Sequence, residues 1–198
     1  MIHIEGYAVV CEADCIADAD GKMPEFLKTE AEWQFFQQSL DRCEVVVLGR
    51  RSHDMTPNPK GRRRLVMTAG IKDVDQTDER TVFWNPAGAT LQNALEPFET
   101  NVARLGVTGG QRVFDWFLTG PDRFHVFHLS RIRGAELIGG TPVFSKISLE
   151  KRAENVLSEA GFQPGDTRAL DAHATVAPWV RAGWKFIEKQ SMARPATL

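Results

Sequence analysis

The order of apolar segments predicts a three-layer α/β domain, in which helices cover both faces of a central sheet. Strand-like and helix-like segments alternate along most of the chain. The run at 45–48 is continuously apolar, which is typical of a strand buried on both faces. The order strand, glycine turn, helix then occurs twice, at 44–52 and at 105–118. Together these three observations favour an α/β fold.

Length and composition indicate a folded globular protein. The chain has 198 residues, of which 42% are hydrophobic and 25% charged, and its formal net charge is -2. These values exclude intrinsic disorder, and no long block of one charge points to a nucleic-acid partner. We expect a single domain over 1–189 and a loose C-terminal tail over 190–198.

Nothing in the sequence points to a membrane or to secretion. The longest apolar stretches are far too short to span a bilayer, and residues 1–5 lack the basic and then apolar layout of a signal peptide. We therefore expect a cytoplasmic protein without a membrane partner.

Local patterns locate the individual elements. Residues 2–11 are expected to form a strand, and 14–24 a polar loop. Thr29 and Glu32 have the spacing of a capping box, so a helix should begin there and end near Asp41. Further strands are expected at 44–48, 64–68, 81–84, 102–107 and 124–129, with an edge strand near 175–179, and further helices at 89–98, 111–118 and 150–160.

Cysteine and histidine give no reason to expect a metal or a disulfide framework. The chain has three cysteines, Cys11, Cys15 and Cys43, and an odd number does not suit a disulfide framework. Cys11 and Cys15 also lack a second Cys or His pair at the spacing of a zinc finger. His125 and His128 lie three apart in an expected strand, so their side chains should point to opposite faces.

Two strand ends carry glycine and basic residues that suit the phosphates of a nucleotide. Gly49 precedes Arg50 and Arg51, and Gly109 precedes Gly110. Backbone without a Cβ can approach a pyrophosphate, and the following helix offers free N–H groups and a positive dipole. An arginine fork suits the 2′-phosphate of NADP. The alternative is an ordinary strand-to-helix connection with solvated arginines.

Several segments in this order resemble the dihydrofolate reductase superfamily, and within it the stand-alone proteins similar to the reductase domain of the bifunctional riboflavin-biosynthesis deaminase-reductase. The resemblance covers about residues 3–144. The segments that carry it are DGKMP at 20–24, an acidic residue six positions after Pro24, LGRRSH at 48–53, RLVMT at 64–68, TGGQRVF at 108–114 and GGTPVF at 139–144.

The resemblance implies a mostly parallel sheet of about eight strands with helices on both faces, an NADPH site at its carboxyl edge, and a homodimer. By resemblance, Arg50 would lie nearest the 2′-phosphate, Thr68 beside the adenosine, and the Gly109–Gly110 turn, often cis, against the nicotinamide end and the pyrophosphate. The complete cofactor-binding set implied is Gly49, Arg50, Arg51, Ser52, Thr68, Gly109, Gly110, Gln111 and Arg112.

Two acidic residues are candidates for catalysis. Glu30 falls where a folate reductase has its substrate-binding carboxylate, and Asp14 lies in a segment similar to the Asp-Gly-x-Ile-Ala segment of the riboflavin-type reductases. A carboxylate beside an apolar helix face could relay a proton as hydride arrives. Glu30 could instead complement the helix dipole, and Asp14 could form an Asx-turn.

The resemblance therefore implies an NADPH-dependent oxidoreductase that acts on a pyrimidine- or pterin-like small molecule. The nearest named reaction is the reduction of 5-amino-6-(5-phosphoribosylamino)uracil in riboflavin biosynthesis. The alternatives are a divergent dihydrofolate reductase, favoured by Met23, Pro24 and Glu30, and an NADP-binding module without turnover.

Overall fold

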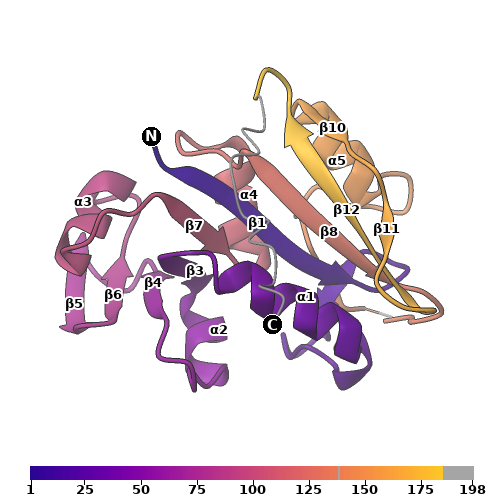
Figure 1. Ribbon diagram of the computed structural model, residues 1–198, viewed down its shortest axis with the longest axis horizontal. Coiled ribbons are helices and arrows are strands. Elements are labelled where there is room, and N and C mark those ends of the chain that lie inside the picture. Colours follow the sequence, from indigo (N-terminus) through magenta and orange to yellow (C-terminus); the bar gives the residue numbers. More distant parts are fainter. Residues whose placement is uncertain (138, 185–198) are drawn as a thin grey trace, which may run out of the picture.

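The computed structural model describes residues 1–137 and 139–184, and one large sheet runs through this part of the chain (Figure 1). The sheet has ten strands, nine of them in the order β10-β12-β8-β1-β7-β3-β4-β6-β5, with β11 paired to β12. A separate two-stranded sheet joins β2 to β9. The expected domain limit at 189 and the expected tail over 190–198 lie outside the described residues.

The strands are β1 (His3–Val10), β2 (Cys15–Ala17), β3 (Val45–Gly49), β4 (Arg63–Met67), β5 (Val74–Asp78), β6 (Thr81–Trp84), β7 (Arg104–Val107), β8 (Val126–Ile132), β9 (Thr141–Pro142), β10 (Phe162–Pro164), β11 (Arg168–Ala169) and β12 (Ala174–Arg181). The helices are α1 (Glu30–Leu40), α2 (Arg50–Met55), α3 (Leu91–Leu95), α4 (Gln111–Thr119) and α5 (Ala153–Glu159), with 3-10 turns η1 (Glu25–Leu27) and η2 (Glu96–Phe98).

The sheet is mostly parallel, as expected. The six inner strands from β8 to β6 pair in parallel, and antiparallel strands flank them on both sides. The expectation of about eight strands was wrong, because β10 and β11 both pair with β12. For the same reason the strand expected near 175–179 is an interior strand and not the edge.

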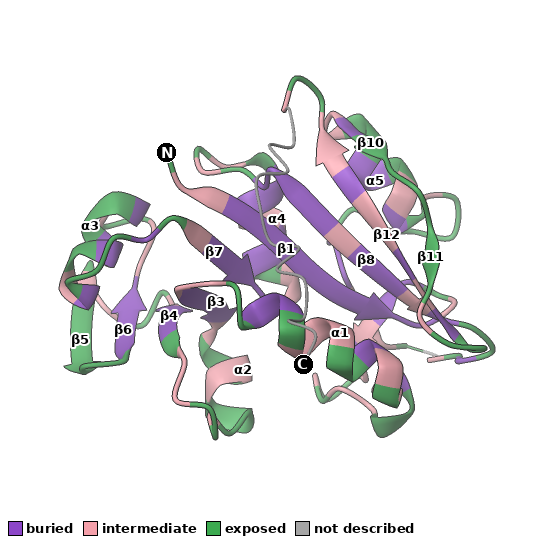
Figure 2. Cartoon of the chain, viewed as in Figure 1, coloured by how far each residue is buried: buried purple, intermediate pink, exposed green. Residues whose placement is uncertain are grey.

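Helices cover both faces of the sheet. On one face, α1 packs through Leu40 against Tyr7 and Val46, and α2 lies beside Phe83. On the other face, α3, α4 and α5 pack on the main core, whose aromatic centre contains Phe114, Phe117, Phe124, Phe127 and Phe144. Figure 2 shows that the inner strands are largely buried along their length. The three-layer α/β architecture is thus confirmed.

Most element boundaries agree with the sequence pattern. Thr29 caps α1 by accepting the Glu32 N–H at 3.3 Å, and α1 ends at Leu40. Two expectations need correction. The loop expected over 14–24 contains β2, and the helix expected over 89–98 is divided into α3 and η2, with Pro97 in the first turn of η2.

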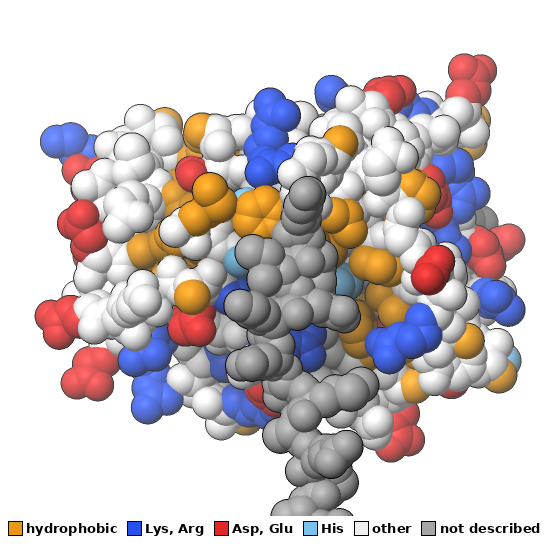
Figure 3. All heavy atoms as spheres, turned by 45° about the horizontal axis from the view of Figure 1, so that its top comes forward, with side chains coloured by type: hydrophobic (Ala, Val, Ile, Leu, Met, Phe, Trp, Pro, Cys, Tyr) orange, Lys and Arg blue, Asp and Glu red, His pale blue; other side chains and the backbone are white. Residues whose placement is uncertain are grey.

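Surface charges are mixed in sign. On the face in Figure 3, basic, acidic and hydrophobic side chains are interspersed, in accord with the net charge of -2. Among the described residues, no helix is long and apolar enough to cross a membrane.

Candidate functional site

Three neighbouring parallel strands end in the residues expected to bind the cofactor. β7, β3 and β4 are adjacent in the sheet, and Gly109, Gly49 and Thr68 stand at or just beyond their carboxyl ends. The Gly49 N–H donates to the Gly109 carbonyl oxygen at 2.9 Å, which joins the two glycine turns directly. Neighbouring strands lie about 4.8 Å apart, so this edge is about 10 Å wide from β7 to β4.

The two glycines of the β7 turn meet different surroundings. The Gly109–Gly110 peptide bond is cis, as the resemblance implied. Gly109 has φ +108°, and a Cβ there would lie 2.9 Å from the Phe114 ring. A Cβ on Gly110 would meet nothing within 4 Å. The turn is therefore packed on its protein side and open in front of the N-terminus of α4.

The two arginines after Gly49 are held differently. The Arg50 Nε lies 2.9 Å from each carboxylate oxygen of Asp54, and its guanidinium carbon lies 4.9 Å above the Phe83 ring. Arg51 instead donates to the carbonyl oxygen of Asp20, in the loop that follows β2. Arg50 thus stays at the sheet edge with its two Nη groups outside the ion pair with Asp54, whereas Arg51 connects α2 to that loop.

The remaining expected cofactor residues surround the same edge. Ser52 lies in the first turn of α2, and Thr68 directly follows β4, where its Oγ1 accepts the Gly70 N–H at 3.1 Å. Gln111 and Arg112 begin α4, and the Gln111 Nε2 donates to the Pro142 carbonyl oxygen at 3.1 Å. All nine residues of the expected set therefore lie on or beside three adjacent strand ends.

Glu30 lies at the first position of α1, where its side chain is exposed. Its Oε1 accepts a hydrogen bond from Gln34 Nε2 at 3.2 Å, one turn further along the helix. A role of Glu30 in catalysis stays a prediction, and its position on the surface is the one expected of a helix-dipole partner.

Glu32 is the acidic residue of α1 that faces inward, and it is not among the site residues expected from the sequence. It is 4% exposed, and burial raises its pKa to about 7, although a hydrogen bond with the Ser130 side chain lowers it. Ser130 lies on β8, which is separated from β7 by β1 in the sheet. A signal was present, since Phe36 and Leu40 follow Glu32 at intervals of four on the inward face.

Asp14 is completely buried and forms ion pairs with two arginines. Its Oδ1 lies 2.6 Å from Arg131 Nη2, and its Oδ2 lies 2.6 Å from Arg152 Nε. These contacts replace the Asx-turn considered from the sequence as the environment of its carboxylate. A catalytic role for Asp14 stays a prediction.

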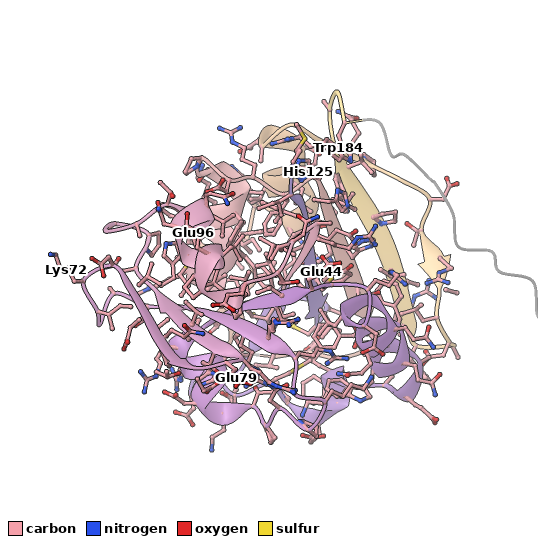
Figure 4. All side chains as sticks on the ribbon, turned by 60° about the vertical axis from the view of Figure 1, so that its left-hand side comes forward. Glu44, Lys72, Glu79, Glu96, His125 and Trp184 are labelled. Carbon is pink, nitrogen blue, oxygen red and sulfur yellow. The ribbon has the colours of Figure 1, made fainter. Side chains whose placement is uncertain are left out.

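Histidine and cysteine do not gather into a metal site. His128 Nε2 lies 3.1 Å from Glu5 Oε2, whereas His125 Nδ1 accepts the Ile4 N–H and its ring packs 3.9 Å from Trp184 (Figure 4). The three cysteines are free thiols. Within the described ranges, no group of three or more His, Cys, Asp or Glu side chains could hold a metal ion.

Comparisons with known proteins bear on the fold. No family model matches this sequence, and no curated protein matches it. A provisionally named riboflavin biosynthesis protein from Shewanella sp. PV-4 has a similar structure, with a TM-score of 0.64, 18% identity, and coverage of 91% of this chain and 99% of its own.

A second similar structure is the diaminohydroxyphosphoribosylaminopyrimidine deaminase/5-amino-6-(5-phosphoribosylamino)uracil reductase from Thermotoga maritima. The TM-score is 0.61 at 14% identity, and the match covers 91% of this chain but 56% of that protein. The chain thus spans little more than half of that protein's length. Similarity at these identities establishes the architecture alone, and the chain has the dihydrofolate reductase-like fold of the two structures.

Proposed function

We propose that the chain is an NADPH-dependent reductase. The observation that carries this proposal is the junction of two glycine turns at one sheet edge, with Gly49 N bonded to Gly109 O and open space in front of Gly110. A backbone segment without side chains, next to the N-terminus of α4, lets a pyrophosphate approach the free N–H groups of the helix. The similarity in fold to reductase structures supports the same cofactor class.

We propose that these nine residues form the cofactor site. Gly110 and the first N–H groups of α4 would hold the pyrophosphate, Gly49 would fix the turn beside them through its hydrogen bond to Gly109, and Thr68 would lie beside the adenosine. Arg50 would bind the 2′-phosphate, because its Nη groups remain outside the pair with Asp54 and a guanidinium binds phosphate oxygens in a fork. NADPH, when bound, supplies hydride.

Glu32 is the proposed proton donor. A carboxyl group whose pKa is about 7 is partly protonated near neutral pH, so it can give a proton to a nitrogen of the substrate while hydride reaches the adjacent carbon. Ser130 holds the carboxyl group in place through its hydrogen bond. We propose this role for Glu32 in preference to exposed Glu30.

The proposed substrate is a small pyrimidine- or pterin-like heterocycle with a carbon–nitrogen double bond. The first candidate is the open-chain form of 5-amino-6-(5-phosphoribosylamino)uracil, as in the Thermotoga maritima neighbour. The second is dihydrofolate, which the buried acid on α1 also suits. Action in the cytoplasm and as a homodimer belongs to the same proposal.

Turnover assays test the proposal and separate its alternatives. Loss of NADPH absorbance is measured with each of the two acceptors, using wild type, Glu32→Gln and Glu30→Gln. We expect turnover with one acceptor, a loss of about 10²-fold or more in Glu32→Gln, and little change in Glu30→Gln. Tight NADPH binding without turnover on either acceptor would instead indicate a non-catalytic nucleotide-binding module.

A further inference from the structure

Asp14 combines complete burial with an unusual backbone conformation. Its side chain is 0% exposed, and its φ of 61° lies in the left-handed region that residues other than glycine seldom adopt. A buried carboxylate costs free energy unless charges and hydrogen bonds compensate it. The surroundings of Asp14 must therefore supply specific partners.

Those partners come from the C-terminal half of the fold. The two carboxylate oxygens of Asp14 lie 2.6 Å from Arg131 Nη2 and 2.6 Å from Arg152 Nε, and the Ala153 N–H donates to Oδ2 at 3.1 Å. Arg131 also pairs with Glu154 at 2.6 Å. At the start of α5, the positive charges of the two arginines are thus compensated by the carboxylates of Asp14 and Glu154.

The same arginines hold the backbone of the turn that carries Asp14. Arg131 Nη1 donates to the Cys11 carbonyl oxygen at 3.0 Å, and Arg152 Nη2 donates to the Glu12 carbonyl oxygen at 2.6 Å. The connection from β1 to β2 is therefore fixed from β8 and from α5 at once.

One chain of contacts runs from Asp14 to the β7 glycine turn. The Asp14 carbonyl oxygen accepts the Val143 N–H at 2.9 Å, which positions the end of β9. The preceding residue, Pro142, accepts the hydrogen bond from Gln111 at the start of α4. Asp14 thus lies two hydrogen bonds from the residue that follows Gly110.

A second chain of contacts runs to the β3 glycine turn. β2 begins directly after Asp14 and leads into a loop closed by the hydrogen bond from Asp18 N to Lys22 O at 2.9 Å. Arg51 of α2 donates to the Asp20 carbonyl oxygen in that loop. The loop 18–22 thus follows the turn that Asp14 anchors, and the segment 141–143 is hydrogen-bonded to that turn.

We propose that Asp14 is a positioning residue for the cofactor site. Its buried carboxylate, clamped by Arg131 and Arg152, holds the loop 18–22 and the segment 141–143 against Arg51 and Gln111, the residues that follow the two glycine turns. The clamp also gives the start of α5 a part in cofactor binding. This inference rests on the proposed function for its cofactor.

The test removes the clamp from its more exposed side. Arg152 is 49% exposed, so Arg152→Ala should fold, and Arg152→Lys keeps the charge without the fork. Lys151→Ala is the matched control, because Lys151 pairs with Glu159 instead. Asp14→Asn removes the carboxylate charge itself. Each variant is compared with wild type by NADPH titration, by kcat and KM, and by hydrogen–deuterium exchange of 15–22 and 139–143.

We expect Arg152→Ala to exchange faster in both segments and to raise the Kd and KM for NADPH about tenfold, with kcat changed less than about twofold. A raised KM with a nearly unchanged kcat is the result expected when a mutation removes binding energy that the ground state and the transition state share. Arg152→Lys should recover part of the affinity, and Lys151→Ala should match wild type. Folded Asp14→Asn protein should show the same faster exchange and the same increase in the Kd and KM for NADPH as Arg152→Ala.

Unchanged exchange in both segments of Arg152→Ala would overturn the proposal. So would a folded Asp14→Asn that loses kcat while its Kd for NADPH is unchanged, because this would make Asp14 a group that acts on the substrate. If wild type binds no NADPH, the proposed function fails, and the exchange measurement still decides whether Asp14 holds the two segments.

Discussion

Replacing Glu32 by glutamine measures how much free energy of unfolding the fold loses by burying an ionisable carboxyl group on α1. The side chain is 4% exposed, and burial raises its pKa to about 7 from an ordinary value of 4.5. Between these two values the folded chain keeps a proton that the unfolded chain releases. Since stability falls with pH wherever the folded state binds more protons, Glu32 makes the fold less stable as the pH rises through this window.

The magnitude follows from the two pKa values. From 4.5 to about 7 is roughly 2.5 pH units, and each unit corresponds to about 1.36 kcal/mol, so the full cost is about 3 kcal/mol above pH 7. Glutamine keeps the size and a hydrogen-bonding group for Ser130 but does not ionise. The free energy of unfolding of Glu32→Gln, relative to wild type, should therefore increase by about 3 kcal/mol between about pH 4 and about pH 8.

Urea unfolding of both proteins at these two pH values measures this difference. Glu30→Gln is the matched control, since it changes an exposed carboxylate two residues away, and its difference from wild type should stay within about 0.5 kcal/mol at both pH values. If the difference in the free energy of unfolding between Glu32→Gln and wild type is the same at both pH values, the raised pKa of Glu32 is contradicted.

Three further predictions follow from packing and charge. Gly110→Ala should weaken NADPH binding at least about tenfold with little change in melting temperature, because the new Cβ enters the open space in front of the turn. Gly109→Ala should instead lower the melting temperature, because the new Cβ would lie 2.9 Å from the Phe114 ring. NADPH titration and thermal melts of both variants check these two results. Although burial alone would raise the pKa of Glu5, hydrogen bonds from histidine and tyrosine hold it well below its usual value. Glu5→Gln should therefore lower the free energy of unfolding by about 3 kcal/mol or more near neutral pH. The difference in this free energy between the variant and wild type should become smaller as the pH falls, which urea unfolding at several pH values tests. Phe114→Ala, at a site 1% exposed among three aromatic rings, should cost about 3–5 kcal/mol in urea unfolding.

Local signals were sufficient for most of the fold. The apolar run before Gly49 and the capping residue Thr29 fix a strand and a helix by short-range rules, and β3 and α1 lie there. β10 and β11 escaped prediction because they are three and two residues long, and their pairing with β12 depends on the tertiary fold.

The site shows the same division. The glycine turns could be located from their motifs, since each is a contiguous segment. The environment of Asp14 could not, because its partners Arg131 and Arg152 lie 117 and 138 residues away. Glu30 and Glu32 both belong to the first turn of α1. The spacing of Glu32 from Phe36 and Leu40 places it on the apolar face of the helix, whereas its burial beside Ser130 of β8 depends on how the helix packs on the sheet.

A titration of the purified protein with NADPH and with NADH, followed by tryptophan fluorescence, tests directly whether the chain has the proposed cofactor site. Arg50→Ala removes the proposed 2′-phosphate contact, and Arg63→Ala changes an exposed arginine at the opposite end of the neighbouring strand β4. We predict that NADPH binds more tightly than NADH, that Arg50→Ala weakens NADPH binding about 10- to 100-fold while hardly affecting NADH binding, and that Arg63→Ala changes the binding of neither nucleotide. Failure of wild type to bind either nucleotide would contradict the central claim and leave the chain with the fold but without the cofactor.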